Sequence, residues 1–192
     1  MGSCMKYLSG QESGRICWKL RMDGRLSGRQ VTDLASELHH DEQGISDVYE
    51  MMFDGTDERV SYNASWVLSH LSPEDKGLYL FPLADRLIDQ VIVSVQHHNL
   101  RSYLAILADM PCIPENRMDL LDFCLSHIAD TKVSHASRSY MIKLAARMCR
   151  PYPELMHELV LCLEMLPPDL PPSLASARRH VVRNVCGTLR KK

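Results

Sequence analysis

The tetrapeptide Arg-Ser-Tyr-Leu at residues 101–104 recurs as Arg-Ser-Tyr-Met at residues 138–141, a spacing of 37 residues. Ala-Ser-Trp-Val stands 37 residues upstream, at 64–67, and Arg-Arg-His-Val stands 40 residues downstream, at 178–181. The apolar positions of residues 83–91 also match those of residues 120–128. Self-similarity at a fixed period of about 20–50 residues is typical of chains built from stacked copies of one unit.

Each copy is predicted to be a pair of helices. From residue 29 onward the apolar residues follow the helical period, and prolines separate the periodic segments. Proline ends a helix because it has no amide hydrogen and its ring clashes with the preceding turn. We expect helices at 29–39, 44–54, 57–71, 76–96, 99–110, 115–130, 134–149, 152–166 and 172–189.

A helix pair that repeats every 37–40 residues, with prolines between the copies, resembles HEAT-like and ARM-type repeats. The resemblance covers about residues 44–190. It implies an all-α fold, a right-handed α-α superhelix (solenoid) of about four HEAT-like helix pairs. Such proteins bury one continuous core and present a concave surface to their partners.

Residues 1–28 have a different pattern. They hold five of the nine glycines, and Ile16, Trp18, Leu20 and Met22 alternate with polar residues before a turn at Asp23-Gly24. The alternation is a weak strand signal, and the alternative is a loosely ordered extension, which we favour. We therefore predict an N-terminal extension at 1–28 and a helical-repeat domain at 29–192.

The repeat also predicts which side of each second helix is buried. The column after the aromatic position is apolar in every copy and marks a buried ridge: Val67, Leu104, Met141 and Val181. The opposite side is small and polar, and it becomes basic in the last copy. This stripe is the candidate binding site, with an ordinary solvated helix face as the alternative: His98, Ser102, His135, Ser139, Lys143, Arg179 and Arg183.

Two other columns have competing interpretations. Trp66, Tyr103 and Tyr140 are either a stacking platform for bases or core residues beside the ridge, and we favour the core. A column of arginines flanks the same ridge. We expect it to pair with aspartates of neighbouring helices rather than with a ligand, the arginines being Arg101, Arg138 and Arg178 and the aspartates Asp85, Asp89, Asp119 and Asp122.

The sequence contains no catalytic or metal-binding motif. The seven cysteines include no CxxC pair, which indicates reduced, buried thiols. His39-His40 and His97-His98 are adjacent pairs, and adjacent residues on a helix point about 100° apart. HExxH, P-loop, GxGxxG and GxSxG patterns are absent from the sequence. We therefore expect no metal and no cofactor, and a binding protein rather than an enzyme.

The distribution of charge along the sequence limits the kinds of partner that the protein can bind. Residues 178–192 contain six Lys and Arg residues and no acid, which leaves 16 basic against 24 acidic residues, a net −8, in the remaining 177. That balance disfavours a long nucleic-acid groove. No apolar run approaches the roughly 18–20 residues of a membrane span, and the N-terminus lacks a signal-peptide layout, so the expected location is cytoplasmic.

These observations predict a non-catalytic binding module or scaffold that engages a protein or peptide through its concave face. The alternative is a nucleic-acid-binding or DNA-repair protein similar to the alkylation-repair glycosylases, which are also built from HEAT-like repeats. No residue of this sequence can be matched to that family's site. The identity of the partner and the oligomeric state stay open.

Overall fold

A computed structural model of the chain describes residues 10–93 and 98–189. Most of these residues are helical and none of them is in a β-strand, which confirms the predicted all-α class. The chain divides into two compact units, Met1–Leu83 and Ala84–Lys192, each of which has its own packing. Among the described helices, none has the length and apolar character needed to cross a membrane.

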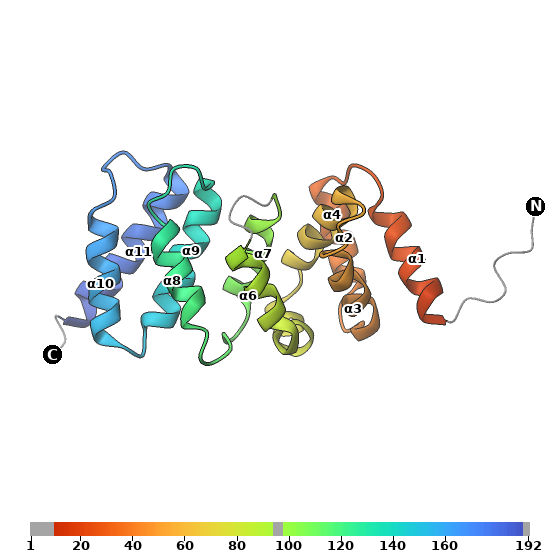
Figure 1. Cartoon of the computed structure of the whole chain (residues 1–192), viewed down its shortest axis with the longest axis horizontal. Coiled ribbons are helices and arrows are strands. Elements are labelled where there is room, and N and C mark those ends of the chain that lie inside the picture. Colours follow the sequence, from red (N-terminus) through yellow and green to blue (C-terminus); the bar gives the residue numbers. More distant parts are fainter. Residues whose placement is uncertain (1–9, 94–97, 190–192) are drawn as a thin grey trace, which may run out of the picture. The chain divides into compact units, whose positions relative to one another are not determined.

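The first unit (Figure 1) consists of α1 (Gly10–Met22), α2 (Gly28–Glu37), α3 (Glu42–Met51), α4 (Glu58–Ser69) and the short α5 (Pro73–Asp75). A π-helical turn, η1 (Lys76–Leu80), and a 3-10 turn, η2 (Phe81–Leu83), follow. α3 packs against α1 and α4, and α4 also packs against α2. Side-chain caps start these helices: Ser27 forms a capping box with Gln30, and Asp57 accepts from the amides of Arg59 and Val60.

The helix α1 contradicts the irregular extension predicted for residues 1–28. The four alternating apolar residues would share one face of a strand, but on the helix they divide between two sides. Met22 is fully buried and Trp18, one turn earlier, is half-buried, whereas Ile16 and Leu20 are exposed at 42 % and 68 %. Because α1 packs on α3 and α4, the residues from Gly10 on belong to the first unit, not to an extension. Residues 1–9 lie outside the described part of the chain.

The second unit is a run of helix pairs. The pairs are α6 (Ala84–Val93) with α7 (Leu100–Asp109), α8 (Met118–His127) with α9 (His135–Cys149), and α10 (Pro153–Glu164) with α11 (Pro172–Leu189). α9 occupies the centre, where it packs against α7, α8, α10 and α11 (Figure 1). This order confirms the predicted stacking of helix pairs.

The single helix predicted at 76–96 is wrong. The described part of that segment is interrupted by η1 and η2, and a regular α-helix begins only at Ala84. Pro82 explains the break, because a proline inside a helix removes one backbone hydrogen bond and clashes with the preceding turn. Residues 94–97 lie outside the described residues.

The predicted ridge is confirmed. Val67 in the first unit and Leu104 and Met141 in the second are fully buried, and Val181 is 5 % exposed.

The prediction of buried thiols is confirmed for only some of the cysteines. Burial raises the pKa of Cys124 to about 12 and that of Cys149 to about 11, whereas other thiols are exposed, at Cys17, Cys112 and Cys162.

Candidate functional site

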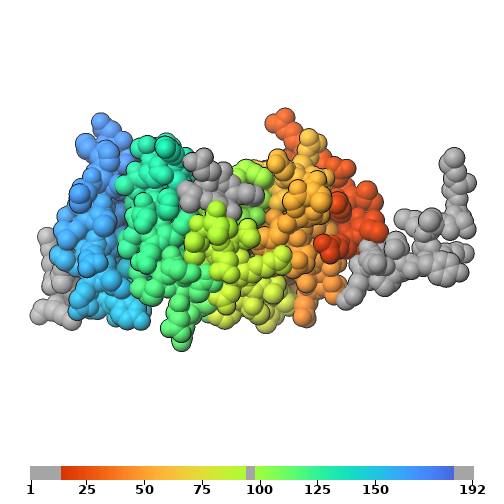
Figure 2. All heavy atoms as spheres, in the orientation of Figure 1, coloured from red at the N-terminus to blue at the C-terminus, as the bar shows by residue number. Residues whose placement is uncertain are grey.

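Charge in the last two helix pairs of the second unit is divided between first and second helices. The first helices, α8 and α10, carry carboxylates: Asp119, Asp122, Glu154, Glu158 and Glu164. The second helices, α9 and α11, contain six lysines and arginines and no acid. Figure 2 shows side chains of α8 and α10, with those of α6 beside them, on the face of this unit that is turned to the viewer. The basic groups therefore belong to helices that offer them no carboxylate along their own length.

Three of the six cations hold the fold together. Arg138 is 3 % exposed, and its Nε donates to the carbonyl oxygen of Ile128 at the end of α8. Arg178 donates in the same way to the carbonyls of Leu166 and Pro167, just after α10. Carbonyls at a helix C-terminus have no intrahelical partner, so these arginines satisfy them. The prediction that they pair with aspartates is wrong.

Arg147 caps a third helix end. Its guanidinium donates to the carbonyl oxygens of Ala108 at 2.7 Å and Met110 at 2.8 Å, at the end of α7. Burial, together with the neighbouring Arg150, lowers the pKa of Arg147. A partly buried cation beside a helix C-terminus also complements the helix dipole.

The other three cations, Lys143, Arg179 and Arg183, are exposed. Arg179 and Arg183 are four residues apart on α11 and so lie on the same side of the helix. Nζ of Lys143 stands 4.9 Å from the centroid of the Tyr140 ring on α9, a cation–π distance. All three lie on α9 and α11, helices that pack against each other, and we refer to them as the basic face.

The structure leaves most residues of the predicted stripe exposed. His98, His135, Lys143, Arg179 and Arg183 are exposed, as expected. Ser102 is half-buried, and Ser139 is only 7 % exposed, which contradicts the prediction. The Oγ of Ser139 donates to the His135 carbonyl one turn earlier at 2.8 Å. A serine can be buried in this way because its short hydroxyl is satisfied by the helix itself.

The aromatic column agrees with the core interpretation. Tyr103 is 2 % exposed, and Trp66 and Tyr140 are half-buried. A buried ring cannot serve as a stacking surface for a base, so the column offers no continuous platform.

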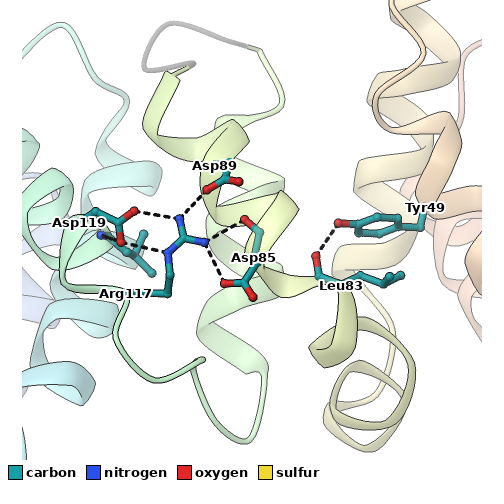
Figure 3. A network of polar contacts seen from close by, with 7 residues as sticks. Tyr49, Leu83, Asp85, Asp89, Arg117 and Asp119 are labelled. Atoms are coloured by element: carbon teal, nitrogen blue, oxygen red, sulfur yellow. Dashed lines mark hydrogen bonds and ion pairs between the residues drawn. The ribbon is translucent and has the colours of Figure 1, made fainter.

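An ion cluster that the sequence did not suggest links the first helices of the second unit (Figure 3). Arg117, just before α8, donates to Asp85 and Asp89 of α6 at 2.9 and 2.7 Å and to Asp119 of α8 at 2.9 Å. The Arg117 side chain is 13 % exposed, whereas the three aspartates are at least half exposed. The hydrogen bond from Arg117 is the main cause of the lowered pKa of Asp119. The cluster is a structural link between two helix pairs.

A cleft of about 350 Å³ lies between the α7–α8 loop and the α9–α10 turn of the same unit. Its polar lining includes Arg117 and Arg147, which are already engaged, as well as Arg150 and Glu115. Cys112 also lines it, but no histidine does. The lining of this cleft therefore places no histidine base beside the Cys112 thiol, although histidine is a common base for activating a catalytic thiol.

The His39-His40 pair does not have the geometry of adjacent residues on a helix. His39 and His40 lie just beyond the end of α2, where their ring centroids are 3.8 Å apart and both rings contact Asp75. Among the described residues, these three form the group of histidine, cysteine and acidic side chains with the spacing of a metal site. His98 is exposed, and its neighbour His97 lies outside the described residues.

The comparisons with known proteins agree with the helix pairs. A family model for the HEAT repeat domain matches residues 18–185. No curated protein and no solved structure matches the chain. The matched segment spans most of the chain and nearly all the helices just described, so this protein belongs to the HEAT repeat family.

Proposed function

We propose that the protein is a non-catalytic binding module whose basic face, formed by Lys143, Arg179 and Arg183, binds an acidic peptide segment of a partner protein. The observation that carries the proposal is the absence of any acid from α9 and α11. Arg179 and Arg183 have no hydrogen-bond or ion-pair partner among the described residues, so they are available to an external carboxylate.

The location of the face supports the same function. α9 and α11 are second helices of their pairs, and solenoids use the concave surface that such stacking creates to bind extended partners. Tyr140 lies half-buried beneath Lys143 and offers apolar surface next to the charge. A peptide of alternating acidic and apolar residues matches that combination.

The small number of exposed cations on the basic face favours a peptide over nucleic acid as the partner. The three exposed cations of the basic face could neutralise few phosphates, whereas salt-sensitive nucleic-acid binders make about 6–10 such contacts. Tyr103, in the aromatic column, is buried and cannot stack on a base.

A competition experiment tests this choice. A fluorescein-labelled peptide rich in Asp, Glu and Leu is titrated with the full chain, and unlabelled peptide or a DNA duplex of equal total charge then competes. We expect displacement by the peptide at lower concentration than by the duplex. The opposite order would establish nucleic-acid binding as the function, and no binding of either probe at low salt would contradict the proposal.

A further inference from the structure

The turn after α2 directs two adjacent histidines toward one buried carboxylate. α2 ends at Glu37 with Leu38 as its C-cap, and His40 adopts a left-handed φ of 60°. In this conformation the main-chain amide of His40 donates to Oδ1 of Asp75 at 3.3 Å. The reversal of the backbone places the two imidazoles side by side instead of about 100° apart, as they would be on a helix.

Each oxygen of Asp75 faces one imidazole. Nδ1 of His39 lies 2.8 Å from Oδ2, and Nδ1 of His40 lies 3.4 Å from Oδ1. The Asp75 side chain is 1 % exposed, whereas the imidazoles are 50 % and 53 % exposed. The three potential ligand atoms lie within 4.8 Å of one another. The carboxylate is therefore buried, whereas the two imidazoles lie at the surface.

The surroundings fix the position of the carboxylate. Besides its contacts with the two imidazoles, Asp75 accepts hydrogen bonds from the Ser72 hydroxyl at 2.7 Å and from the main-chain amide of His40 at 3.3 Å. The next residue, Lys76, is also buried, and its Nζ donates to the carbonyl oxygen of Ser69 at 2.8 Å. The Asp75 carboxylate is therefore held in a fixed orientation.

Two imidazole nitrogens and one carboxylate oxygen are the donor set of open zinc sites, in which a water molecule or substrate takes the remaining position. Zinc accepts this mixture of nitrogen and oxygen ligands, whereas calcium and magnesium require oxygen. Hydrogen bonds that fix a ligating carboxylate, as the Ser72 hydroxyl does here at 2.7 Å, are typical of metal sites.

We propose that His39, His40 and Asp75 form a Zn²⁺ site in the first unit. The ligands are Nδ1 of each histidine and the carboxylate of Asp75, and solvent has access to the remaining position. Bound zinc links the end of α2 to α5, two segments that are far apart in the sequence, and so stabilises the first unit against unfolding.

Asparagine is the substitution that separates metal binding from folding. In His39→Asn and His40→Asn the amide nitrogen occupies about the position of Nδ1 and can still donate to Asp75, but it does not ligate zinc as an imidazole does. Asparagine also tolerates the left-handed conformation of residue 40. His157→Asn, on the exposed side of α10 in the second unit, is the matched control.

Zinc alone is the probe. Isothermal titration of the full chain, kept reduced, measures the bound equivalents for the wild-type chain, the double variant and the control. We expect the double variant to bind one equivalent fewer than the wild-type chain and the control. The seven cysteines are common to all three chains, so any thiolate binding is a constant background. Equal numbers of equivalents in all three chains would overturn the proposal.

A second measurement does not depend on the variants. In the wild-type chain, long-range ¹H–¹⁵N spectra of the imidazole rings report which nitrogen binds the metal. We expect zinc to shift the Nδ1 resonances of His39 and His40, while that of His157 stays unchanged. Unshifted His39 and His40 resonances at saturating zinc would exclude the site even if the double variant failed to fold.

Discussion

The side-chain amide of Asn63 on α4 donates to the main-chain oxygens of Met22 at 2.7 Å and Gly24 at 2.8 Å, and so fastens the end of α1 to α4. Asn63 is 3 % exposed, and Met22 is fully buried. Asn63→Ala leaves two carbonyls without this donor, a change that costs about 1–3 kcal/mol for a buried group. Urea denaturation measures the effect, with the exposed Arg59→Ala on the same helix as a control that stays within about 0.5 kcal/mol.

Removal of α1 tests its membership of the first unit directly. A chain that begins at residue 25 keeps the Ser27 cap of α2 but loses the buried Met22 side chain and both acceptors of Asn63. We expect it to melt at lower temperature and less cooperatively than the full chain in calorimetry. Unchanged melting would restore the boundary after residue 28 that the sequence suggested.

Burial of the ridge predicts that shortening one of its side chains destabilises the fold. Leu104 is fully buried on α7, so Leu104→Ala removes buried methyl groups and leaves a cavity, which costs about 2–5 kcal/mol. Arg101→Ala, on the exposed side of the same helix, is the comparison. Equal midpoints for the two variants in urea would mean that the ridge is not part of the core.

The cluster around Arg117 predicts an acid-dependent loss of stability. The lowered pKa of Asp119 means that its contribution to folding is present above the ordinary value of 3.8 and is lost as the pH falls through the lower folded-state pKa. Arg117→Met removes the cation, leaves three aspartates together and destabilises the chain by about 1–3 kcal/mol. Unfolding midpoints from pH 7 to pH 3 measure this. We expect the difference between wild type and variant to shrink with acid, and a constant difference would contradict the ion-pair explanation.

The fold was largely predictable because residues at equivalent positions of the repeat pack in similar environments. Leu104 and Met141 occupy one column and are buried alike, since each lies between the same kinds of neighbouring helix. Ile106 and Lys143 also share a column, but Ile106 is buried and Lys143 is exposed. A shared position therefore predicts burial only when the residue type in every copy supports it.

The candidate sites were less predictable because backbone details decide them. Ser139 was expected on the surface, but its hydroxyl donates a hydrogen bond within α9. Its burial therefore leaves the hydroxyl with a hydrogen-bond partner. His39 and His40 converge only because residue 40 is left-handed, and no periodicity encodes that. Arg117 lies in a loop outside the repeat columns, so its three carboxylate partners could not be assigned from spacing.

The most direct test of the proposed function reverses the charge of the basic face. Lys143→Glu, Arg179→Glu and Arg183→Glu are combined in one chain. The control combines Arg25→Glu, Arg29→Glu and Lys132→Glu, which are also exposed but lie off α9 and α11, so that both chains have the same net charge. Calorimetry first confirms that both melt near the wild-type temperature, as exposed substitutions do.

Fluorescence anisotropy then measures the affinity of the labelled acidic peptide at several salt concentrations. Three exposed ion pairs of about 0.2–1 kcal/mol each predict a loss of roughly tenfold for the basic-face variant and a flatter salt dependence. The control is predicted to bind as the wild-type chain does, apart from a small general effect of net charge. Equal losses in the two variants, or an unchanged affinity in both, would contradict the basic face of α9 and α11 as the binding site.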